Sequence, residues 1–285
     1  MAALAQAQAF AYALRPFADA LTFLTTTHVH PTFFPYPWAS TLHATRVSMA
    51  YQNNMRKSGS NLSWGTYVAG YLIMCWGGMV ISHTLLSLPP PILFSIDPYI
   101  NYIVPHLIVT LLFTIFPDIL TSPNLDLVLF PLDGLLRANA VTSTLAMISS
   151  NPAIDAKLTS SALFHIIIGA VVSCGGGVSA ATLKTWTSEW SFGTPIFLRS
   201  GVGFWGSLDV WAGSLVAIVY STMTIHPAFD EVVPFEVSPA FALSSLGAKA
   251  VGSYIYTILF GLRVWNARLA SAAVAEKGKG KTKTQ

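Results

Sequence analysis

Two apolar stretches, each long enough to cross a membrane as a helix, carry a cluster of glycines near the middle. The first runs from about Trp64 to Leu88 and contains Gly77 and Gly78, and the second runs from about Ser160 to Trp186 and contains Gly175, Gly176 and Gly177. Consecutive glycines inside a helix are costly, because a glycine backbone loses the most entropy on ordering. A broken helix in a bilayer is tolerated only where protein or a water-filled cavity satisfies the freed backbone groups. We therefore expect a break in each stretch, and a path or binding site where the two breaks meet.

The composition is that of an integral membrane protein. Of the 285 residues, 53% are hydrophobic and only 9% are charged, and the mean hydropathy is +0.57. A soluble domain carries about 25% charged residues. The length suits roughly six to eight spans with short loops. The N-terminus lacks the pattern of a cleaved secretory signal, so we expect no removed peptide. Both cysteines lie in the middle of a predicted span, which favours small buried apolar side chains over a disulfide framework.

The apolar periodicity divides the chain into an N-terminal segment 1–30, a channel-sized domain 34–266 and a basic tail 267–285. Within the first segment, Ala7–Leu24 is expected to form a lumenal or interfacial helix, or a span, with Arg15 and Asp19 paired one turn apart. The tail Glu276–Gln285 is polar and is expected to be disordered. The candidate spans are Phe34–Tyr51, Trp64–Leu88, Tyr102–Ile119, Leu125–Ile148, Ser160–Trp186, Gly201–Met223 and Ala240–Trp265. The first of these is the weakest, because it carries prolines together with His43 and Arg46.

A weak internal repeat supports counting that first span. The two glycine clusters lie about 99 residues apart, and Phe34-Pro35 and Phe130-Pro131 lie about 96 residues apart. A similar phrase follows each cluster, Pro91-Ile92-Leu93-Phe94 in one case and Pro195-Ile196-Phe197-Leu198 in the other. The common order predicts an all-α membrane protein of two three-span repeats, 34–120 and 125–224, plus a seventh helix at 240–266. Because three is odd, the second repeat would be inverted in the membrane, as in several transport proteins.

The distribution of charge gives a predicted orientation. With seven spans, most basic residues of the connectors and all the tail lysines fall on one side, and the acidic loop Asp230–Glu236 falls on the other. The positive-inside rule then places the C-terminus in the cytosol and the N-terminus in a lumen or outside. Lys281 and Lys283 stand at positions typical of a dilysine retrieval signal for the endoplasmic reticulum. A merely solubilising tail, or one attracted to anionic lipids, is an equal alternative.

Charged residues inside predicted spans are functional candidates, because they usually face the interior of a helix bundle. Asp133 and Arg137 lie one turn apart in the fourth span, so an ion pair between them is expected. A structural pair and a role in a pore or at a lipid headgroup both stay open for these two residues and for Lys184. Asp209 in the sixth span and Lys249 in the seventh differ in depth, so a direct pair requires the lysine to extend toward the centre. The histidines of the predicted spans, His83, His106 and His165, are expected to be packed and hydrogen-bonded rather than metal-ligating.

No spacing typical of a metal site, a phosphate loop or a hydrolytic triad stands in the sequence. We therefore expect no enzyme activity, no metal and no nucleic-acid partner. An enzyme or a scaffold acting on lipid gains little support, because the charged residues are too dispersed to form a catalytic set.

The sequence resembles the trimeric intracellular cation channel family over most of its length, from about Phe34 to Asn266. The resemblance rests on the three-plus-three-plus-one layout and the glycines of spans two and five. It rests also on Phe116-Pro117-Asp118-Ile119-Leu120, which is similar to the family's proline-aspartate segment at the end of span three. Gly175-Gly176-Gly177-Val178 is similar to the triple-glycine motif of the prokaryotic members.

The resemblance implies a homotrimer in a membrane of the endoplasmic reticulum, with one pore per protomer for potassium, sodium and other monovalent cations. It implies a counter-ion current that balances calcium release, no cofactor, and a bound phosphoinositide lipid near span four. The animal members carry Lys-Glu-Val in that span, where this chain has Arg137-Ala138-Asn139-Ala140-Val141. The prokaryotic members follow the triple glycine with an arginine-aspartate pair, where this chain has Ser179-Ala180. A secondary transporter with alternating access, built on the same inverted repeat, is the alternative function.

Overall fold

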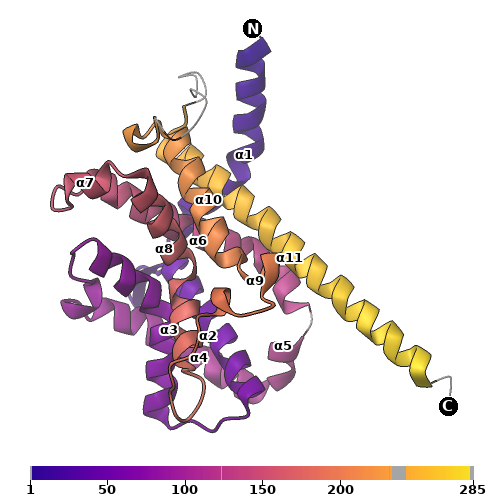
Figure 1. Ribbon diagram of the computed structural model, residues 1–285. Coiled ribbons are helices and arrows are strands. Elements are labelled where there is room, and N and C mark those ends of the chain that lie inside the picture. The colour runs from indigo at the N-terminus through magenta and orange to yellow at the C-terminus, as the bar shows by residue number, and fades with distance from the viewer. Residues whose placement is uncertain (1, 123, 231, 233–241, 283–285) are drawn as a thin grey trace.

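The protein is a bundle of α-helices with one short β-hairpin near its N-terminus. A computed structural model describes residues 2–122, 124–230, 232 and 242–282 (Figure 1). The long helices are α1 (Ala2–Thr26), α2 (Trp38–Ser58), α3 (Trp64–Leu85), α4 (Asp97–Ile115), α6 (Leu125–Ser150), α8 (Ala162–Leu183), α10 (Leu208–Met223) and α11 (Ser245–Thr282). The shorter elements are β1 (His28–His30), β2 (Phe34–Pro37), α5 (Pro117–Thr121), α7 (Ala156–Thr159), α9 (Gly203–Gly206) and three 3₁₀ turns, η1 (Pro91–Leu93), η2 (Ile196–Leu198) and η3 (Pro227–Phe229).

Three helices among the described residues are both long and apolar enough to cross a membrane, namely α3, α4 and α8. The helix α10 is apolar but has only 16 residues. The protein is therefore a candidate multi-pass membrane protein. The count of seven spans and the inverted repeat stay predictions.

Several predicted boundaries shift for local reasons. The prolines of Phe34–Pro37 form strand β2, which pairs antiparallel with β1, so the first predicted span begins as a helix only at Trp38. Because proline disfavours a helical conformation in the residue before it, α4 ends at Ile115 and Pro117 starts the separate helix α5. The predicted span Gly201–Met223 divides into α9 and α10.

The two ends of the chain form helices that project from the bundle. Figure 1 shows α1 extending upward to the N-terminus and α11 crossing the molecule diagonally to the C-terminus. The expected N-terminal helix is confirmed and is longer than predicted, and Arg15 and Asp19 lie 3.6 Å apart on its surface. Leu14 packs against Ala250 and Val251 of α11. The helix α11 continues to Thr282, so the prediction that the tail from Glu276 is disordered is wrong for the described residues. Most of the acidic loop Asp230–Glu236 lies outside the described residues.

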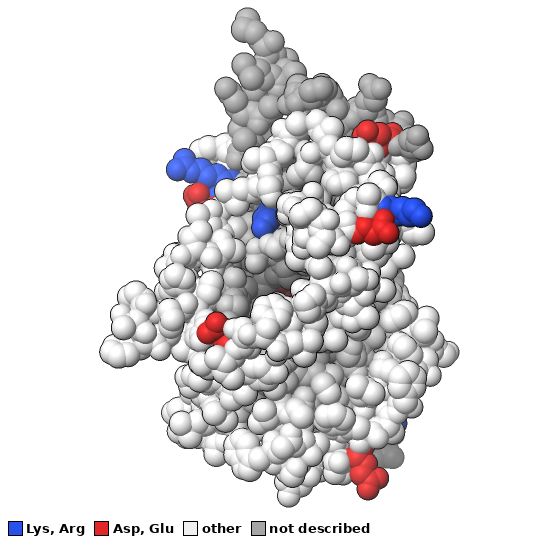
Figure 2. All heavy atoms as spheres, turned by 90° about the vertical axis from the view of Figure 1, so that its left-hand side faces the viewer, with Lys and Arg blue, Asp and Glu red and all other residues white. Residues whose placement is uncertain are grey.

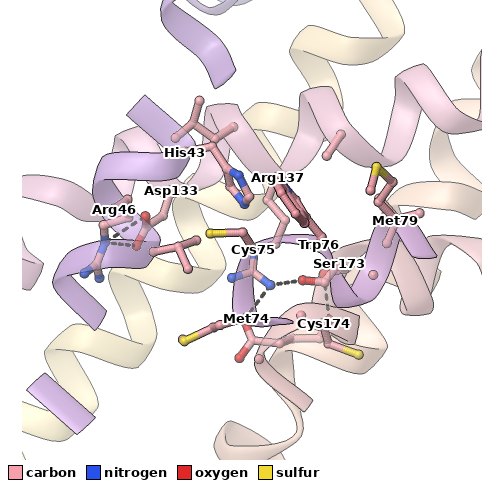
Figure 3. Close-up of a pocket in the computed structure, with 18 of the residues that line it drawn as sticks. His43, Arg46, Met74, Cys75, Trp76, Met79, Asp133, Arg137, Ser173 and Cys174 are labelled. Carbon is pink, nitrogen blue, oxygen red and sulfur yellow. Dashed lines mark hydrogen bonds and ion pairs between the residues drawn. The ribbon is translucent and has the colours of Figure 1, made fainter. Parts of the chain in front are cut away.

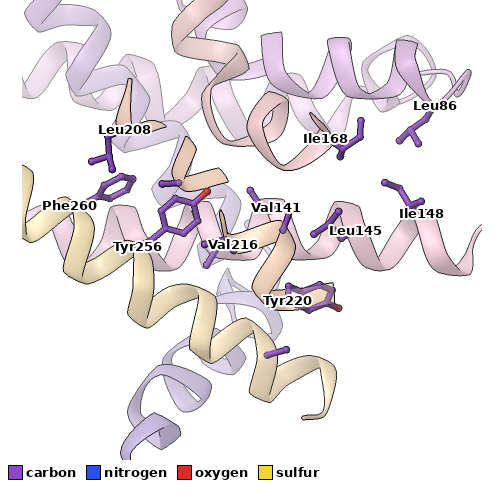
Figure 4. Close-up of a cluster of buried hydrophobic side chains, with 14 of the residues drawn as sticks. Leu86, Val141, Leu145, Ile148, Ile168, Leu208, Val216, Tyr220, Tyr256 and Phe260 are labelled. Atoms are coloured by element: carbon purple, nitrogen blue, oxygen red, sulfur yellow. The ribbon is translucent and has the colours of Figure 1, made fainter. Parts of the chain in front are cut away.

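The largest apolar core joins α6, α8, α10 and α11 (Figure 4). Leu145, Val216 and Phe260 are at most 1% exposed in this cluster. The end of α3 reaches the same core through Leu86, which is 1% exposed. A second, more aromatic cluster lies around Tyr51 and Tyr71. Burial of these side chains fixes the positions of the helices that surround the cavity described below.

The helices α3 and α8 pack against each other in opposite directions, and the glycine clusters form the point of closest approach. A methyl group built on Gly175 would lie 2.6 Å from the Cα atom of Gly78, and one on Gly77 would lie 2.8 Å from the hydroxyl oxygen of Ser179. A methyl group on Gly176 would overlap the carbonyl oxygen of Met74. Both helices continue through their clusters, from Trp64 to Leu85 and from Ala162 to Leu183. The prediction that the glycines break the helices is therefore wrong: they allow two intact helix backbones to touch.

Small residues also allow close backbone approach where other pairs of helices cross. Gly169 of α8 faces Gly213 of α10, and neither position has room for a methyl group. Gly134 of α6 faces Thr257 of α11, whose hydroxyl oxygen would lie 2.7 Å from an added methyl carbon. Gly177 differs, because nothing lies within 4 Å of a methyl group built there. Four of the five predicted pore glycines thus make close helix contacts, and Gly177 alone of the five has no atom near an added methyl group, while Gly78, Gly176 and Gly177 also line the cavity described below.

Substitution of the clustered glycines by alanine tests this division. Gly175→Ala should lower the free energy of unfolding by about 1–3 kcal/mol, because the α3 backbone must move away. Gly177→Ala is the matched control and should leave stability unchanged or raise it by up to about 1 kcal/mol, since alanine is the better helix former. Thermal unfolding of the purified variants in detergent measures both. Equal losses in the two variants would contradict the packing role of Gly175.

Candidate functional site

A cavity of about 1190 Å³ lies between α2, α3, α6 and α8, with contributions from the ends of other helices. Its lining begins near Tyr36 and Asp97, where β2 and α4 meet, and extends to Asn54 and Trp186, where the ends of α2 and α8 meet. Figure 2 shows one face of the molecule hollowed near its middle, with few charged side chains around the hollow. The cavity therefore has lining residues at both ends of α2.

Arg46 of α2 joins α2 to α6 at the cavity wall. Its Nε atom donates to both carboxylate oxygens of Asp133, at 2.9 and 3.0 Å (Figure 3). Its Nη2 atom lies 2.8 Å from a carboxylate oxygen of Asp126. The Arg46 side chain is 21% exposed and that of Asp133 is 17% exposed. Two carboxylates thus neutralise one guanidinium. The predicted pair of Asp133 with Arg137 is wrong, because the carboxylate of Asp133 bonds to the arginine of the neighbouring helix.

Asp209, in the first turn of α10, holds two arginines. Its carboxylate lies 3.2 Å from Arg137 of α6 and 2.9 Å from Arg263 of α11. The ring of Phe260 lies beneath both guanidinium groups, with its centroid 5.1 Å from Arg137 and 4.7 Å from Arg263. Such cation–π contacts stabilise guanidinium groups where water is scarce. One carboxylate and one aromatic face therefore hold two cations of different helices together.

A hydrogen-bonded chain fixes this cluster to α8. Arg137 donates to the backbone carbonyl of Ser173. The Ser173 hydroxyl in turn accepts from the Tyr256 hydroxyl at 2.9 Å and donates to the backbone carbonyl of Asp209 at 2.6 Å. Ser173 directly precedes Cys174 and the triple glycine. The helix that carries the glycine contact is thereby bonded to the charges that line the cavity.

The two predicted lysines, Lys249 and Lys184, lie apart from the two arginine clusters. Lys249 donates to the hydroxyl oxygen of Ser143 at 2.8 Å, whereas Asp209 is held by Arg137 and Arg263, in keeping with the predicted difference in depth between Lys249 and Asp209. Lys249 still lines the cavity. Lys184 is exposed at the end of α8 in a left-handed conformation, with φ 52°, and lies outside the cavity lining.

The histidines of the predicted spans are packed and hydrogen-bonded, as expected. His106 stacks on Tyr71 with ring centroids 3.8 Å apart, and its Nδ1 atom lies 2.7 Å from the Ser48 hydroxyl. His165 is buried and bonds to the backbone carbonyl of Thr159 at 3.1 Å. His83 bonds to the carbonyl of Met79 at 2.9 Å. Among the described residues, no three His, Cys, Asp or Glu side chains gather in a way that would hold a metal ion.

Tyr36 and Asp97 form a polar contact at one end of the cavity, outside the long helices. The Tyr36 hydroxyl donates to the Asp97 carboxylate at 3.3 Å, and the Ser95 hydroxyl donates to the other oxygen at 2.9 Å. Burial, together with the Asp97 charge and this hydrogen bond, raises the pKa of Tyr36 above its ordinary value. The tyrosine therefore stays a hydrogen-bond donor throughout the physiological pH range.

Three cavity residues were missed by sequence reasoning. In the sequence, His43 and Arg46 weaken the case for a span in their segment, and Arg263 stands near the end of the last predicted span. All three line the cavity. The available signal was their occurrence within helices whose other residues are mainly apolar, because ionisable groups in such helices usually face the bundle interior.

Comparison of the chain with protein-family models, with curated proteins and with solved structures finds no match. The likeness to the trimeric intracellular cation channels thus rests on the quoted motifs and the order of the helices, and stays a prediction.

Neutralising Asp209 tests the two-arginine cluster. Asp209→Asn leaves Arg137 and Arg263 close together without a carboxylate, so the free energy of unfolding should fall by about 2 kcal/mol or more. Asp19→Asn removes the exposed pair with Arg15 and should cost less than about 0.5 kcal/mol. Thermal unfolding of both variants at the same ionic strength gives the comparison. Equal stability of Asp209→Asn and Asp19→Asn would show that the cluster contributes nothing to folding.

Proposed function

We propose that this protein is a channel for monovalent cations, potassium above all, with one pore in each protomer. The observation that carries the proposal is the cavity of about 1190 Å³, whose lining residues stand at both ends of α2 and on intact helices of both predicted repeats. The antiparallel packing of α3 and α8 supports the proposal as well, because the second helices of two inverted repeats would run in opposite directions.

The charge balance of the lining fits a cation path with a barrier. Asp133 of the lining, together with Asp126 outside it, pairs with Arg46, and Asp209 pairs with Arg137 and Arg263. Arg199, which also lines the cavity, donates to the backbone carbonyls of Thr194 and Ala181. Lys249 bonds to a neutral hydroxyl, so its charge stays uncompensated by those pairs. A fixed positive charge beside a narrow path opposes the entry of cations. Lys249 therefore acts as the electrostatic barrier of the proposed pore.

The proposal extends to assembly and location. We propose a homotrimer of the endoplasmic reticulum or another intracellular membrane, with the N-terminus in the lumen, the C-terminus in the cytosol and a counter-ion role during calcium release. Apolar side chains on the outer face of α4, such as Ile108, Leu111 and Ile115, are 59–62% exposed and fit contact with lipid or with a second protomer. A phosphoinositide near Arg137 belongs to the same proposal.

Recording from the purified protein in planar bilayers tests the central proposal. Discrete unitary currents carried by potassium are expected in symmetric potassium solutions, and replacement by sodium measures selectivity. Flux that saturates without unitary events, or that is strictly coupled to a second solute, would instead support the secondary transporter. A vesicle preparation without the protein is the control for leak.

The barrier assigned to Lys249 gives a sharper expectation. Lys249→Gln keeps a hydrogen-bonding side chain beside Ser143 and removes the charge, so the unitary potassium conductance should rise about two- to fivefold. Lys157→Gln, in the exposed helix α7, is the matched control and should leave the conductance unchanged. An unchanged conductance in Lys249→Gln would remove this residue from the path.

A further inference from the structure

A strained turn follows α10, at the opposite end of that helix from Asp209. Ile225, two residues after the helix ends, has a φ of 51°, which lies in the left-handed region. A β-branched residue rarely adopts this conformation, because its side chain is crowded by the backbone. The backbone N–H of His226 donates to the carbonyl of Ser221 at 2.8 Å and closes the turn. The turn is therefore a costly conformation that neighbouring contacts must hold in place.

The His226 side chain caps the 3₁₀ turn η3, which comes next. Its Nδ1 atom accepts from the backbone N–H of Ala228 at 3.2 Å. Because a backbone N–H only donates, this nitrogen must carry a lone pair, and the ring proton must lie on Nε2. A protonated imidazole has an N–H at both nitrogens and cannot accept this bond. The cap therefore exists only while His226 is neutral.

The same ring lies against a buried imidazole of α8. The ring centroids of His226 and His165 lie 4.6 Å apart, and the ring of Phe229, in η3, lies 5.9 Å from that of His165. His165 and Phe229 are both buried. The Nε2 atom of His165 lies 3.1 Å from the carbonyl of Thr159, in α7, and its Nδ1 atom lies 3.4 Å from the Ser221 hydroxyl. The capped turn thereby fastens the end of α10 to α7 and α8.

Two titratable groups of the described chain face His226, namely the imidazole of His165 and the carboxylate of Asp230. Burial lowers the pKa of His226 below its ordinary value, and the negative charge of Asp230 opposes part of that shift. A base whose pKa is lowered by folding stabilises the fold above its unfolded pKa of about 6.5. This contribution is lost as the pH falls through the folded pKa. The hydrogen bond and the pKa thus agree that acid weakens the turn.

From this geometry we propose that His226 is a proton-operated latch on the end of α10. The neutral ring caps η3 and holds the strained turn against His165, and protonation of Nδ1 by water removes the cap and releases the turn. The ring is partly exposed, so water reaches it. The other end of α10 carries the carboxylate that holds two arginines at the cavity, so the latch anchors the helix on which that cluster depends. The alternative is a permanent structural cap that pH does not affect.

Hydrogen–deuterium exchange of the purified full-length protein in detergent, followed by mass spectrometry, decides between the latch and the permanent cap. The exchange is measured at about pH 7.5 and about pH 5, on either side of the ordinary histidine pKa, with times scaled to the intrinsic rate at each pH. Peptides that cover 221–230 should exchange at least about fivefold faster in acid after this scaling, because local opening exposes their amides. Peptides of the α6 core around Leu145 should show no such change.

Three variants separate the titration of His226 from other effects of acid. His226→Asn supplies a capping oxygen that accepts at every pH, so the scaled exchange of 221–230 should be equally slow at both values. His226→Ala lacks the cap and should exchange quickly at both. His28→Asn, at an exposed histidine of β1, is the matched control and should respond to pH as the unaltered protein does.

Three results would overturn the latch. They are scaled exchange that does not depend on pH in the unaltered protein, the same acceleration in His226→Asn, and an equal acceleration in the α6 peptides, which would mean general unfolding. The measurement needs no ion current, so its outcome is independent of the proposed channel function.

Discussion

The close contact between α3 and α8 is the constraint on which the rest of the structure depends. Gly77 and Gly78 meet Gly175 and Gly176 with no space for a methyl group at the points of contact. In a bilayer, association of helices relies on close packing and on hydrogen bonds, because lipid tails are as apolar as the side chains they replace. Small residues let the two backbones approach, and this approach sets the spacing of the walls of the cavity.

The positions of the packed helices decide which charged side chains meet. With α3 and α8 in contact, α6 and α11 bring Arg137 and Arg263 to the same carboxylate of Asp209. One turn earlier on α6, Asp133 meets Arg46 of α2. The Arg46–Asp133 pair thus ties the two predicted repeats together, and the Asp209 cluster ties the second repeat to the seventh helix. Charges inside a membrane are stable only when paired in this way, or when water reaches them.

The cavity wall combines these paired charges with sulfur, imidazole and aromatic groups. Carboxylates that are bound by arginine cannot easily ligate a passing cation, so the unpaired features of the wall define its chemistry. Those features are the charges of Lys249, which donates to a hydroxyl, and of Arg199, which donates to backbone carbonyls.

The sequence by itself determined the class of protein and the position of most helices. Apolar runs of about 20 residues predict membrane helices whatever their neighbours are, so α3, α4 and α8 could be located within a few residues.

The glycines did not by themselves determine whether a helix breaks or continues. The sequence indicated that the glycine clusters were special, but a glycine can break a helix or let another helix approach, and only the packing of α3 on α8 showed the second. The partners of the charged residues were also decided by the tertiary structure. Asp133 and Arg137 lie one turn apart, yet each pairs with a side chain from a different helix, because the relative rotation of packed helices is not encoded in the spacing of residues along any one of them.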